Sequence, residues 1–393
     1  MQTDNDDIQQ ASATATDTQP DKKQWRQRVF IKVITNLCRC ILAVTFLFSG
    51  FVKANDPLGT QYKLQDYLTA WGITPPDFLL LLAAIGIAFF EFALGTYLAL
   101  GRRRRLTSRI TLAFMAVMTL LTIYIAIYNP VSDCGCFGDA IILTNAQTLE
   151  KNIFLLIAAI IIARHPRCMA RLMPPKIDWI ITTIAMVGII AYAVYALYAL
   201  PPIDFRPYKV GTDIAEAVNG NAGMEFDVTI VYEKDGKQIE LTLDDDDPDS
   251  TWTYVETRRK PVENIEQKLI NLYVEDDGDD ITTDIITDEG DIFLLIAPDL
   301  AKADQGAISR INELYDYTTQ HENMEFYCIT ASPQKDKEQW IDHTGAEYII
   351  YDSEERMLKT IVRANPGLVH IHNGIIVNKW SNWNLPETFP SEE

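Results

Sequence analysis

Histidine and cysteine are scarce in this chain of 393 residues, which has five histidines and six cysteines. No spacing of the two residue types matches a closed zinc site, which needs four ligands at short, regular intervals. Four cysteines fall in or beside apolar stretches, unlike the framework of a small secreted domain. These scarcities argue against a zinc protein and a disulfide-rich module. The cysteines are Cys38, Cys40, Cys134, Cys136, Cys168 and Cys328.

Basic residues are scarce in the second half of the chain. Residues 1–200 have 18 Lys and Arg against 13 Asp and Glu, a net charge of +5, whereas 201–393 have 16 against 41, a net charge of −25. Nucleic-acid binding needs a positive footprint, so we expect no nucleic-acid partner. The length predicts two or three domains.

Long apolar runs dominate the first half. The first run is too long for a signal-peptide core and lacks a small-residue cleavage site, so it predicts an uncleaved membrane helix. Residues 1–28 form a predicted disordered tail with a basic flank. Residues 52–77 predict an ordered cap with a short amphipathic helix at Tyr62–Ala70. The five predicted spans are Val29–Phe51, Phe78–Leu100, Leu106–Tyr128, Thr148–Ala163 and Trp179–Leu200.

Charge in the short loops predicts the orientation. Three basic clusters fall on one side of a five-span arrangement, and the positive-inside rule makes that side cytoplasmic. The opposite side, where disulfides persist, then holds 52–77, the loop after the third span and all of 201–393. We expect a bacterial inner-membrane protein with a cytoplasmic N-terminus and a periplasmic C-terminal domain. The clusters are Lys22–Arg28, Arg102–Arg105 and the group Arg164, Arg167, Arg171 and Lys176.

The second half predicts strands and helices. Residues 225–243 indicate a hairpin, and the acidic runs at 244–249 and 275–280 indicate solvated loops rather than calcium sites. From residue 291 the pattern is β–α–β–α–β–α–β–β, ending in a hairpin at Asn373-Gly374. The predicted domains are a four-helix membrane domain at 29–165, a loop and fifth helix at 166–200, a β-rich subdomain at 201–290 and an α/β domain at 291–393. The predicted elements of the last are strands 292–297, 324–329, 347–351, 368–372 and 375–380 and helices 301–320, 335–343 and 354–364.

The seven residues Asp133-Cys-Gly-Cys-Phe-Gly-Asp139, between the third and fourth spans, carry the predicted chemistry. Glycine between Cys134 and Cys136 relaxes the backbone enough for a small disulfide ring. A strained or exposed disulfide is oxidising and labile, which suits thiol exchange. Asp133 and Asp139 raise the thiol pKa unless Lys53 or a helix N-terminus offsets them. The alternative is a structural clasp that fixes the loop.

Two charges lie inside the predicted spans, where an ionisable group indicates function by default. Counting from the span ends puts Arg39 and Glu91 at similar depth, so they could pair across the first two spans. Such a pair either fixes the helix register or takes part in proton or quinone chemistry. Cys38 and Cys40 face different sides of one helix and are expected to pack as small apolar residues. Cys168, predicted cytoplasmic, and Cys328, on a buried strand, have no predicted role.

The segment Arg39–Lys53, continued by Asp56-Pro57-Leu58-Gly59, resembles the DoxX superfamily of four-helix membrane proteins. With the CGCFG sequence between the third and fourth spans it most resembles the branch of the methylamine utilisation protein MauE, over roughly residues 25–165. That branch is associated with periplasmic disulfide formation in a dehydrogenase subunit, and other DoxX relatives with thiosulfate:quinone oxidoreductases. The resemblance implies that Cys134 and Cys136 are a redox pair, with Arg39 and Lys53 as lesser candidates.

Residues 291–385 resemble a thioredoxin-like fold, with Asn365-Pro366-Gly367 in place of its cis-proline turn. The active-site position, residues 297–301, has no cysteine, so the resemblance implies a binding role. The chain also lacks the second cysteine pair of DsbB-type oxidoreductases. The leading prediction is therefore support of extracytoplasmic thiol/disulfide chemistry with a thiol protein or redox partner, and with quinone as a candidate acceptor. The alternatives are a non-enzymatic membrane scaffold and a quinone-linked subunit for small sulfur compounds.

Overall fold

The computed structural model describes residues 22–128, 135–221, 226–234, 237–242, 252–261, 272–276, 279–286 and 290–386. The predictions for the tail at 1–21, for Asp133 and Cys134, for the acidic run at 244–249 and for the hairpin tip at 235–236 lie outside these residues. The chain divides into two compact units. The first comprises 1–51, 87–136 and 143–188, and the second 52–86, 137–142 and 189–393.

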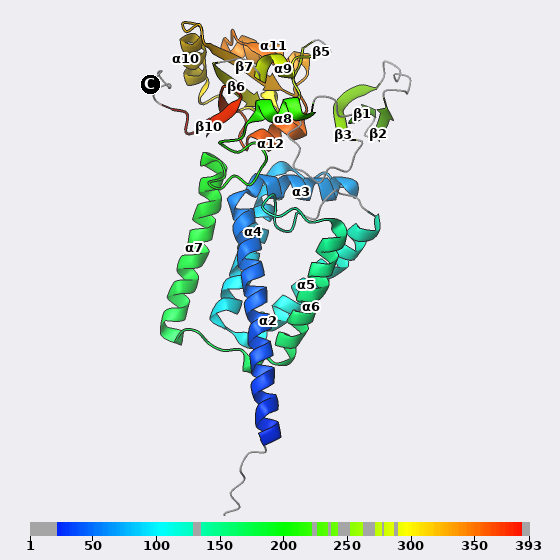
Figure 1. The fold of residues 1–393 in the computed structure, drawn as a ribbon, viewed down its shortest axis with the longest axis vertical. Coiled ribbons are helices and arrows are strands. Elements are labelled where there is room, and N and C mark those ends of the chain that lie inside the picture. Colours follow the sequence, from blue (N-terminus) through cyan, green and yellow to red (C-terminus); the bar gives the residue numbers. More distant parts are fainter. Residues whose placement is uncertain are drawn as a thin grey trace, which may run out of the picture. The chain divides into compact units, whose positions relative to one another are not determined.

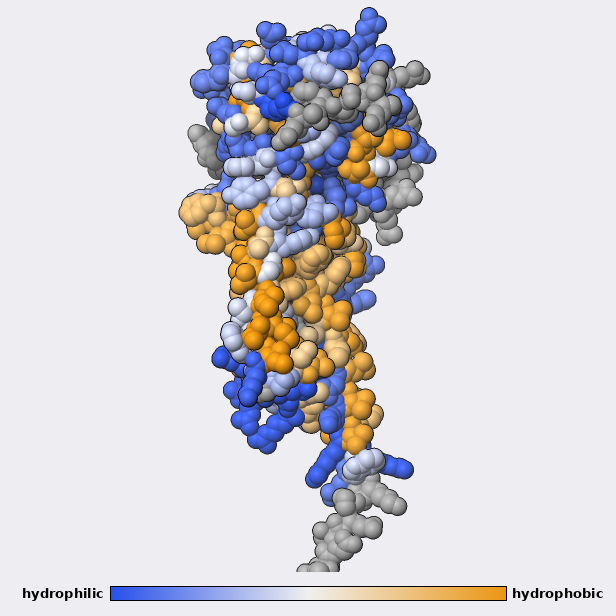
Figure 2. Space-filling model, turned by 90° about the vertical axis from the view of Figure 1, so that its left-hand side faces the viewer, coloured by the Kyte–Doolittle hydropathy of each residue, from blue (hydrophilic) through white to orange (hydrophobic). Residues whose placement is uncertain are grey.

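Five helices are long and apolar enough to cross a membrane, which confirms the predicted number of spans. On the face drawn in Figure 2, apolar surface covers the long helices and hydrophilic surface covers the α/β domain. Large apolar side chains that face outward from these helices suit a lipid environment better than water. The helices are α2 Lys22–Asn55, α4 Asp77–Leu100, α5 Arg104–Tyr128, α6 Asn145–Arg164 and α7 Pro175–Ala199 (Figure 1).

The core of the first unit brings α2, α4, α5 and α6 together. Small residues let α2 approach α4: a Cβ on Gly50 would lie 2.5 Å from Phe92 N, and one on Gly95 would lie 2.6 Å from Leu47 N. Close backbone approach through small residues is the usual means of helix packing in membranes. The buried residues of this core are Leu42, Ala43, Phe46, Leu94, Leu98, Met115, Leu155, Ala158, Ala159, Ile162 and Met169.

Helix α2 is longer than predicted. Its 34 residues span about 51 Å at helical rise, against the roughly 30 Å of a bilayer core. Trp25, Phe30 and Val33 near its start are all largely exposed. The predicted cap helix is confirmed as α3, Pro57–Ala70, which begins earlier than expected because the Asp56 carboxylate caps it by accepting from Gly59 N at 2.8 Å.

The main sheet of the second unit has the strand order β10-β9-β6-β7-β8-β4-β5. Strands β6, β7 and β8 are parallel, and β9 and β10 are antiparallel to their neighbours, so the sheet is mixed, as expected for the α/β domain predicted in this half. The strands are β4 Glu275–Asp276, β5 Asp279–Asp280, β6 Asp291–Ala297, β7 Met324–Thr330, β8 Ile349–Asp352, β9 Gly367–His372 and β10 Ile375–Ser381.

Helices cover both faces of this sheet, so its central strands are apolar on both sides. Along β6, Ile292, Leu294 and Ile296 face one layer, and Phe293, Leu295 and Ala297 face the other. The first layer takes residues from α8 (Ile214–Asn221), α9 (Thr282–Ile286) and α12 (Glu355–Ile361), and the second from the 3₁₀ helix η2 (Leu300–Lys302), α10 (Ile308–Thr318) and α11 (Gln334–Thr344).

Several elements differ from the prediction. The helix expected at 301–320 begins only at Ile308, since the Asp304 carboxylate accepts from Gly306 N in a turn. The run 275–280, expected as a loop, contributes β4 and β5 to the sheet edge. The predicted hairpin is confirmed as β1 Phe226–Lys234 and β2 Lys237–Thr242, with an unpredicted third strand, β3 Thr253–Pro261. Residues 211–215 hydrogen-bond to the β9–β10 hairpin.

Candidate functional site

The described part of the cysteine loop, from Gly135 onward, turns at its two glycines. Gly135 and Gly138 have φ angles of 62° and 51°, a left-handed conformation that favours glycine. Between them, the Cys136 carbonyl oxygen lies 2.6 Å from the Ser49 hydroxyl of α2. This hydrogen bond fixes the backbone of Cys136 to the membrane helix that carries the Ser49-Gly50 sequence.

Ser49 also contacts the acid of the second span. Its Oγ lies 2.7 Å from Glu91 Oε2, and both residues are buried, at 6% and 4% exposure. A hydroxyl has one hydrogen, so Ser49 can donate to Cys136 O or to Glu91 but not to both at once. The arrangement joins the cysteine backbone, a hydroxyl and a carboxyl group inside the bundle.

The predicted pairing of Arg39 with Glu91 is wrong. Arg39 Nη1 donates to the Ala170 carbonyl at 2.6 Å, and its Nε is buried without a partner among the described residues. Asn36 supports the same loop by donating to Cys168 O and accepting from Ala170 N. Arg39 therefore anchors the chain after α6, a contact that neither of its two predicted roles included.

The depth estimate failed because it started from Val29. Arg39 lies level with the end of α4: a Cβ on Gly101 would be 3.2 Å from Arg39 Nη1. Glu91 lies beside Ser49, which is ten residues further along α2 than Arg39, or about 15 Å at helical rise. Arg39 and Glu91 are therefore too far apart along the bundle to form an ion pair.

Within the second unit, Arg363 joins two aspartates that are far apart in the sequence. The Arg363 Nε donates to Asp56 Oδ2 at 2.9 Å, and its Nη2 lies 3.4 Å from Asp139 Oδ2. Asp56 is also the cap of α3, and Asp139 follows Cys136 by three residues. A single guanidinium thus joins the start of α3 to the residues that follow the cysteines.

This cluster is largely withdrawn from water. Arg363 is 7% exposed; burial alone would lower its pKa, but the charges of Asp56 and Asp139 outweigh this and raise it. The guanidinium lies 5.4 Å from the centre of the Tyr62 ring, and Lys359 Nζ lies 4.8 Å from it. Burial raises the Tyr62 pKa to about 12, so the phenol stays neutral. Lys53, the cation that the sequence suggested could offset the two aspartates, is buried on α2 at 8% exposure.

Arg363 belongs to the loop that takes the place of the thioredoxin cis-proline turn. The peptide bond between Asn365 and Pro366 is cis, as the resemblance implied. Asn365 Nδ2 donates to Asp299 O at 2.7 Å, and Asp304 N donates back to Asn365 O at 2.9 Å. This loop therefore packs on the cysteine-free active-site position, while its Arg363 holds Asp139.

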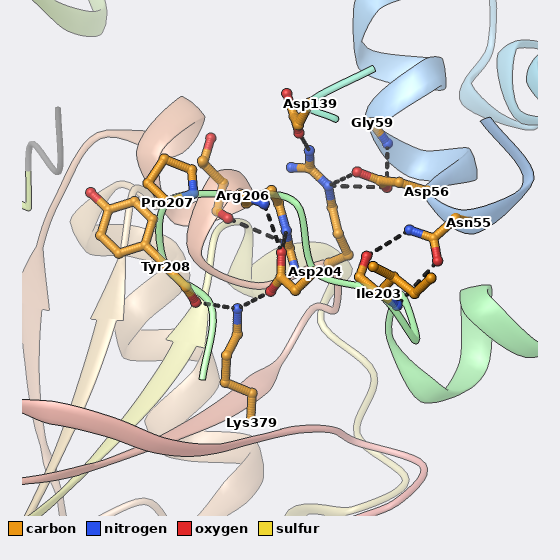
Figure 3. Close-up of polar contacts among 12 residues, drawn as sticks. Asn55, Asp56, Gly59, Asp139, Ile203, Asp204, Arg206, Pro207, Tyr208 and Lys379 are labelled. Atoms are coloured by element: carbon orange, nitrogen blue, oxygen red, sulfur yellow. Dashed lines mark hydrogen bonds and ion pairs between the residues drawn. The ribbon is translucent and has the colours of Figure 1, made fainter. Parts of the chain in front are cut away.

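A second network ties the chain after α7 into the same domain. Asp204 accepts from Arg206 Nε at 2.7 Å and from Lys379 Nζ at 2.8 Å (Figure 3). Asn55 of α2 donates to Ile203 O and accepts from Tyr192 of α7. Burial and the Arg206 charge lower the Lys379 pKa to about 8, against the opposing effect of Asp204. The entry into the α/β domain is thus held by hydrogen bonds from its first residues.

The remaining cysteines are dispersed. Cys38 and Cys40 lie on α2, and Cys168 in the anchored chain after α6. Cys328 is fully buried on β7, and burial raises its pKa to about 12. Within the described residues, no group of three or more His, Cys, Asp and Glu side chains could hold a metal ion.

Cys328 is expected to resist thiol reagents. In the folded protein at pH 8 it is protonated and inaccessible, so peptide-level mass spectrometry after maleimide treatment should find it unmodified until denaturant is added. Its thiol also stays protonated in the folded state from pH 9 to 12, where the unfolded state ionises. This group therefore makes stability fall as pH rises through that window. Labelling without denaturant at the rate of Cys168 would contradict the expectation.

Sequence reasoning did not find Ser49, Asn36, Asp56, Tyr62 or Arg363 as partners in this site. Ser49 and Asp56 lie in the segment that carries the DoxX resemblance, and Asn36 is a polar residue in an apolar span, a recognisable signal. Arg363 has no local signal, because its partners are 307 and 224 residues away in the sequence.

Comparison with known families supports the predicted membrane domain in the first half of the chain. Residues 31–164 match the family described as methylamine utilisation protein MauE, about a third of the chain, so the chain carries a MauE-type membrane domain. Residues 226–264, which hold β1 to β3, match a domain of unknown function, DUF8463. No curated protein and no solved structure matched the chain.

Proposed function

We propose that this membrane protein supports thiol/disulfide chemistry outside the cytoplasm through Cys134 and Cys136, and that its α/β domain positions the cysteine loop and binds the partner thiol protein. The observation that carries the proposal is the contact of the buried Arg363 with the partly exposed Asp139, three residues after Cys136. It connects residues just after the cysteines to the loop that carries the cis Asn365–Pro366 bond, in the domain to which we assign partner binding. The MauE-type domain supports a role in maturing a partner protein.

The reaction follows from the chemistry of a cysteine pair. A thiolate of the partner attacks one sulfur of the Cys134–Cys136 disulfide and forms a mixed disulfide, and the other cysteine leaves as a thiolate. A second thiolate of the partner then attacks the partner's sulfur in that mixed disulfide, and the cysteine of this chain leaves as a thiolate. The partner gains a disulfide, and the cysteine pair takes up two electrons. These electrons pass to an oxidising redox protein or to a quinone, which regenerates the pair.

Asp139 has a positioning role in this proposal. A carboxylate near the cysteines disfavours their thiolates, and Arg363 offsets that charge by direct contact. Ser49 meanwhile holds the Cys136 carbonyl, so the loop is fixed on both flanks of its described part. These two contacts hold the residues from Cys136 to Asp139, which directly follow the proposed redox pair's first cysteine and glycine in the sequence.

Trapping the mixed disulfide tests the proposal. In a Cys136→Ala variant, Cys134 lacks its resolving partner, and we expect a reducible adduct with an extracytoplasmic protein on non-reducing electrophoresis. A Cys168→Ala variant should give no adduct, and Cys134→Ala/Cys136→Ala should give none either. If neither single variant of the pair forms an adduct and the pair has a potential below about −300 mV, it is a structural clasp.

A further inference from the structure

Two adjoining hollows lie at the end of the bundle where α4 and α5 meet and where α6 ends. Their volumes are about 550 Å³ and about 420 Å³, and they share Arg105, Pro166 and Arg167. The first is lined by Arg103, Arg104, Arg105, Leu106, Pro166, Arg167 and Arg171, and the second by Arg105, Ser108, Arg109, Ala163, Arg164, His165, Pro166 and Arg167.

Seven arginines line these hollows without a single carboxylate. The nearby Asp178 lies 3.5 Å from Arg102, which lines neither hollow. The Nε of Arg104 is buried and has no partner within the described residues. Like charges at such density repel one another unless an anion lies among them. The hollows therefore have the charge and the unused donors of an anion site.

The position of the hollows identifies the kind of anion. They lie at the ends of two candidate membrane spans, the place where a bilayer around these helices has its headgroups, and the apolar residues Leu106 and Ile110 are exposed beside them. Hydrophilic surface gathers at one end of the long helices in Figure 2. The forked guanidinium matches phosphate oxygens two at a time. Basic pockets between membrane helices on the cytoplasmic side bind anionic lipid headgroups.

We propose that the two hollows bind the headgroup of an anionic phospholipid with two phosphates, a diphosphatidylglycerol, with one phosphate in each hollow. Arg105 and Arg167 lie in both hollows and so would lie between the two phosphates. Their side chains are exposed and make no hydrogen bond or ion pair with any other described residue, so they are available to a ligand.

Charge that serves only to orient the helices is the competing explanation for these arginines. It requires basic residues near the span ends but no shared hollow. The chain offers a matched comparison, because Arg26 and Arg28 are exposed at the start of α2 and line neither hollow. Removing two arginines from the hollows, and in a second variant two from the start of α2, distinguishes a lipid site from an effect of basic residues at any position.

Native mass spectrometry of the purified full chain tests the proposal. With diphosphatidylglycerol, phosphatidylglycerol and phosphatidylcholine supplied in turn, we expect diphosphatidylglycerol to bind at least tenfold more tightly than phosphatidylcholine. The Arg105→Gln/Arg167→Gln variant should lose at least tenfold in that affinity, whereas Arg26→Gln/Arg28→Gln should keep it. Thermal midpoints and cysteine-accessibility mapping of the five spans should be the same in both variants.

Three results would overturn the proposal. Equal affinity for the zwitterionic and anionic lipids would show that the hollows bind no anionic headgroup. Equal losses of lipid affinity in the two double variants would show that the lipid is attracted by basic residues in general and not by the hollows. Displacement of the lipid by millimolar pyrophosphate would show that the hollows bind a soluble phosphate compound instead. A double variant that fails to fold can be replaced by Arg105→Lys/Arg167→Lys, which keeps the charge but removes the fork, and which should lose preference for diphosphatidylglycerol over phosphatidylglycerol.

Discussion

Replacing Arg363 by Gln is expected to destabilise the protein by about 3 kcal/mol, the low end of the cost of breaking a buried ion pair, because Asp139 is partly exposed. The change leaves Asp56 and Asp139 facing each other without the guanidinium that separates them. It also removes the cation from the Tyr62 ring. The midpoint of thermal unfolding should fall by roughly 6–12 °C.

A neighbouring arginine provides the matched control for this variant. Arg356 also pairs with an aspartate of α3, Asp66, at 3.2 Å, but it is 68% exposed. The Arg356→Gln change removes the same charge from the same helix region and should cost less than about 1 kcal/mol. Hydrogen exchange should further show faster exchange at 137–142 in Arg363→Gln alone. Equal midpoints for the two variants would mean that the Arg363 cluster contributes no more than a surface pair.

Replacing Gly50 by Ala is expected to be almost as harmful, since the added methyl group has no space. Its Cβ would lie 2.5 Å from Phe92 N and 2.8 Å from Ala88 O, both backbone atoms of α4. The two helices must separate, which also pulls Ser49 away from Glu91. Overpacking of this kind costs about 1–3 kcal/mol. The thermal midpoint of the detergent-solubilised protein, read by size-exclusion chromatography, should fall accordingly.

Gly86 is the control for the added methyl group. A Cβ there meets no atom within 4 Å, and the residue lies on the same helix, α4. Gly86→Ala should be neutral, or stabilising by up to about 1 kcal/mol, because alanine loses less backbone entropy than glycine in a helix. If Gly50→Ala unfolds at the same temperature as Gly86→Ala, α2 and α4 do not pack through Gly50.

Local patterns predicted most of the fold. The five spans, the β1–β2 hairpin and the sheet strands from residue 291 follow from apolar periodicity and turn residues, which are read within a few positions. The same patterns misplaced the start of α10 and missed β4 and β5, whose two-residue strands are too short to show alternation. The Asn373-Gly374 turn was readable because both residues adopt positive φ.

The candidate site could be predicted less well than the fold, because its contacts join residues that are far apart in the sequence. Ion pairs such as that of Arg363 and Asp56 form between segments that the fold brings together. The sequence around either residue therefore contains no pattern that predicts the pair. Arg39 was misassigned because its partner is a backbone carbonyl, which any residue can supply. The cysteine motif itself could be found because its two cysteines, two glycines and two aspartates stand within seven consecutive residues.

The chain between α7 and the α/β domain is short. Only Leu200, Pro201 and Pro202 separate the end of α7 from Ile203, the first residue hydrogen-bonded to Asn55, and Asp204 follows at once with Arg206 and Lys379. Domains on flexible linkers sample a wide volume and capture partners at any approach. The three residues after α7 are too few to act as such a linker. The path of the chain into the α/β domain is therefore set by the hydrogen bonds of Ile203 and Asp204 and not by the length of a spacer.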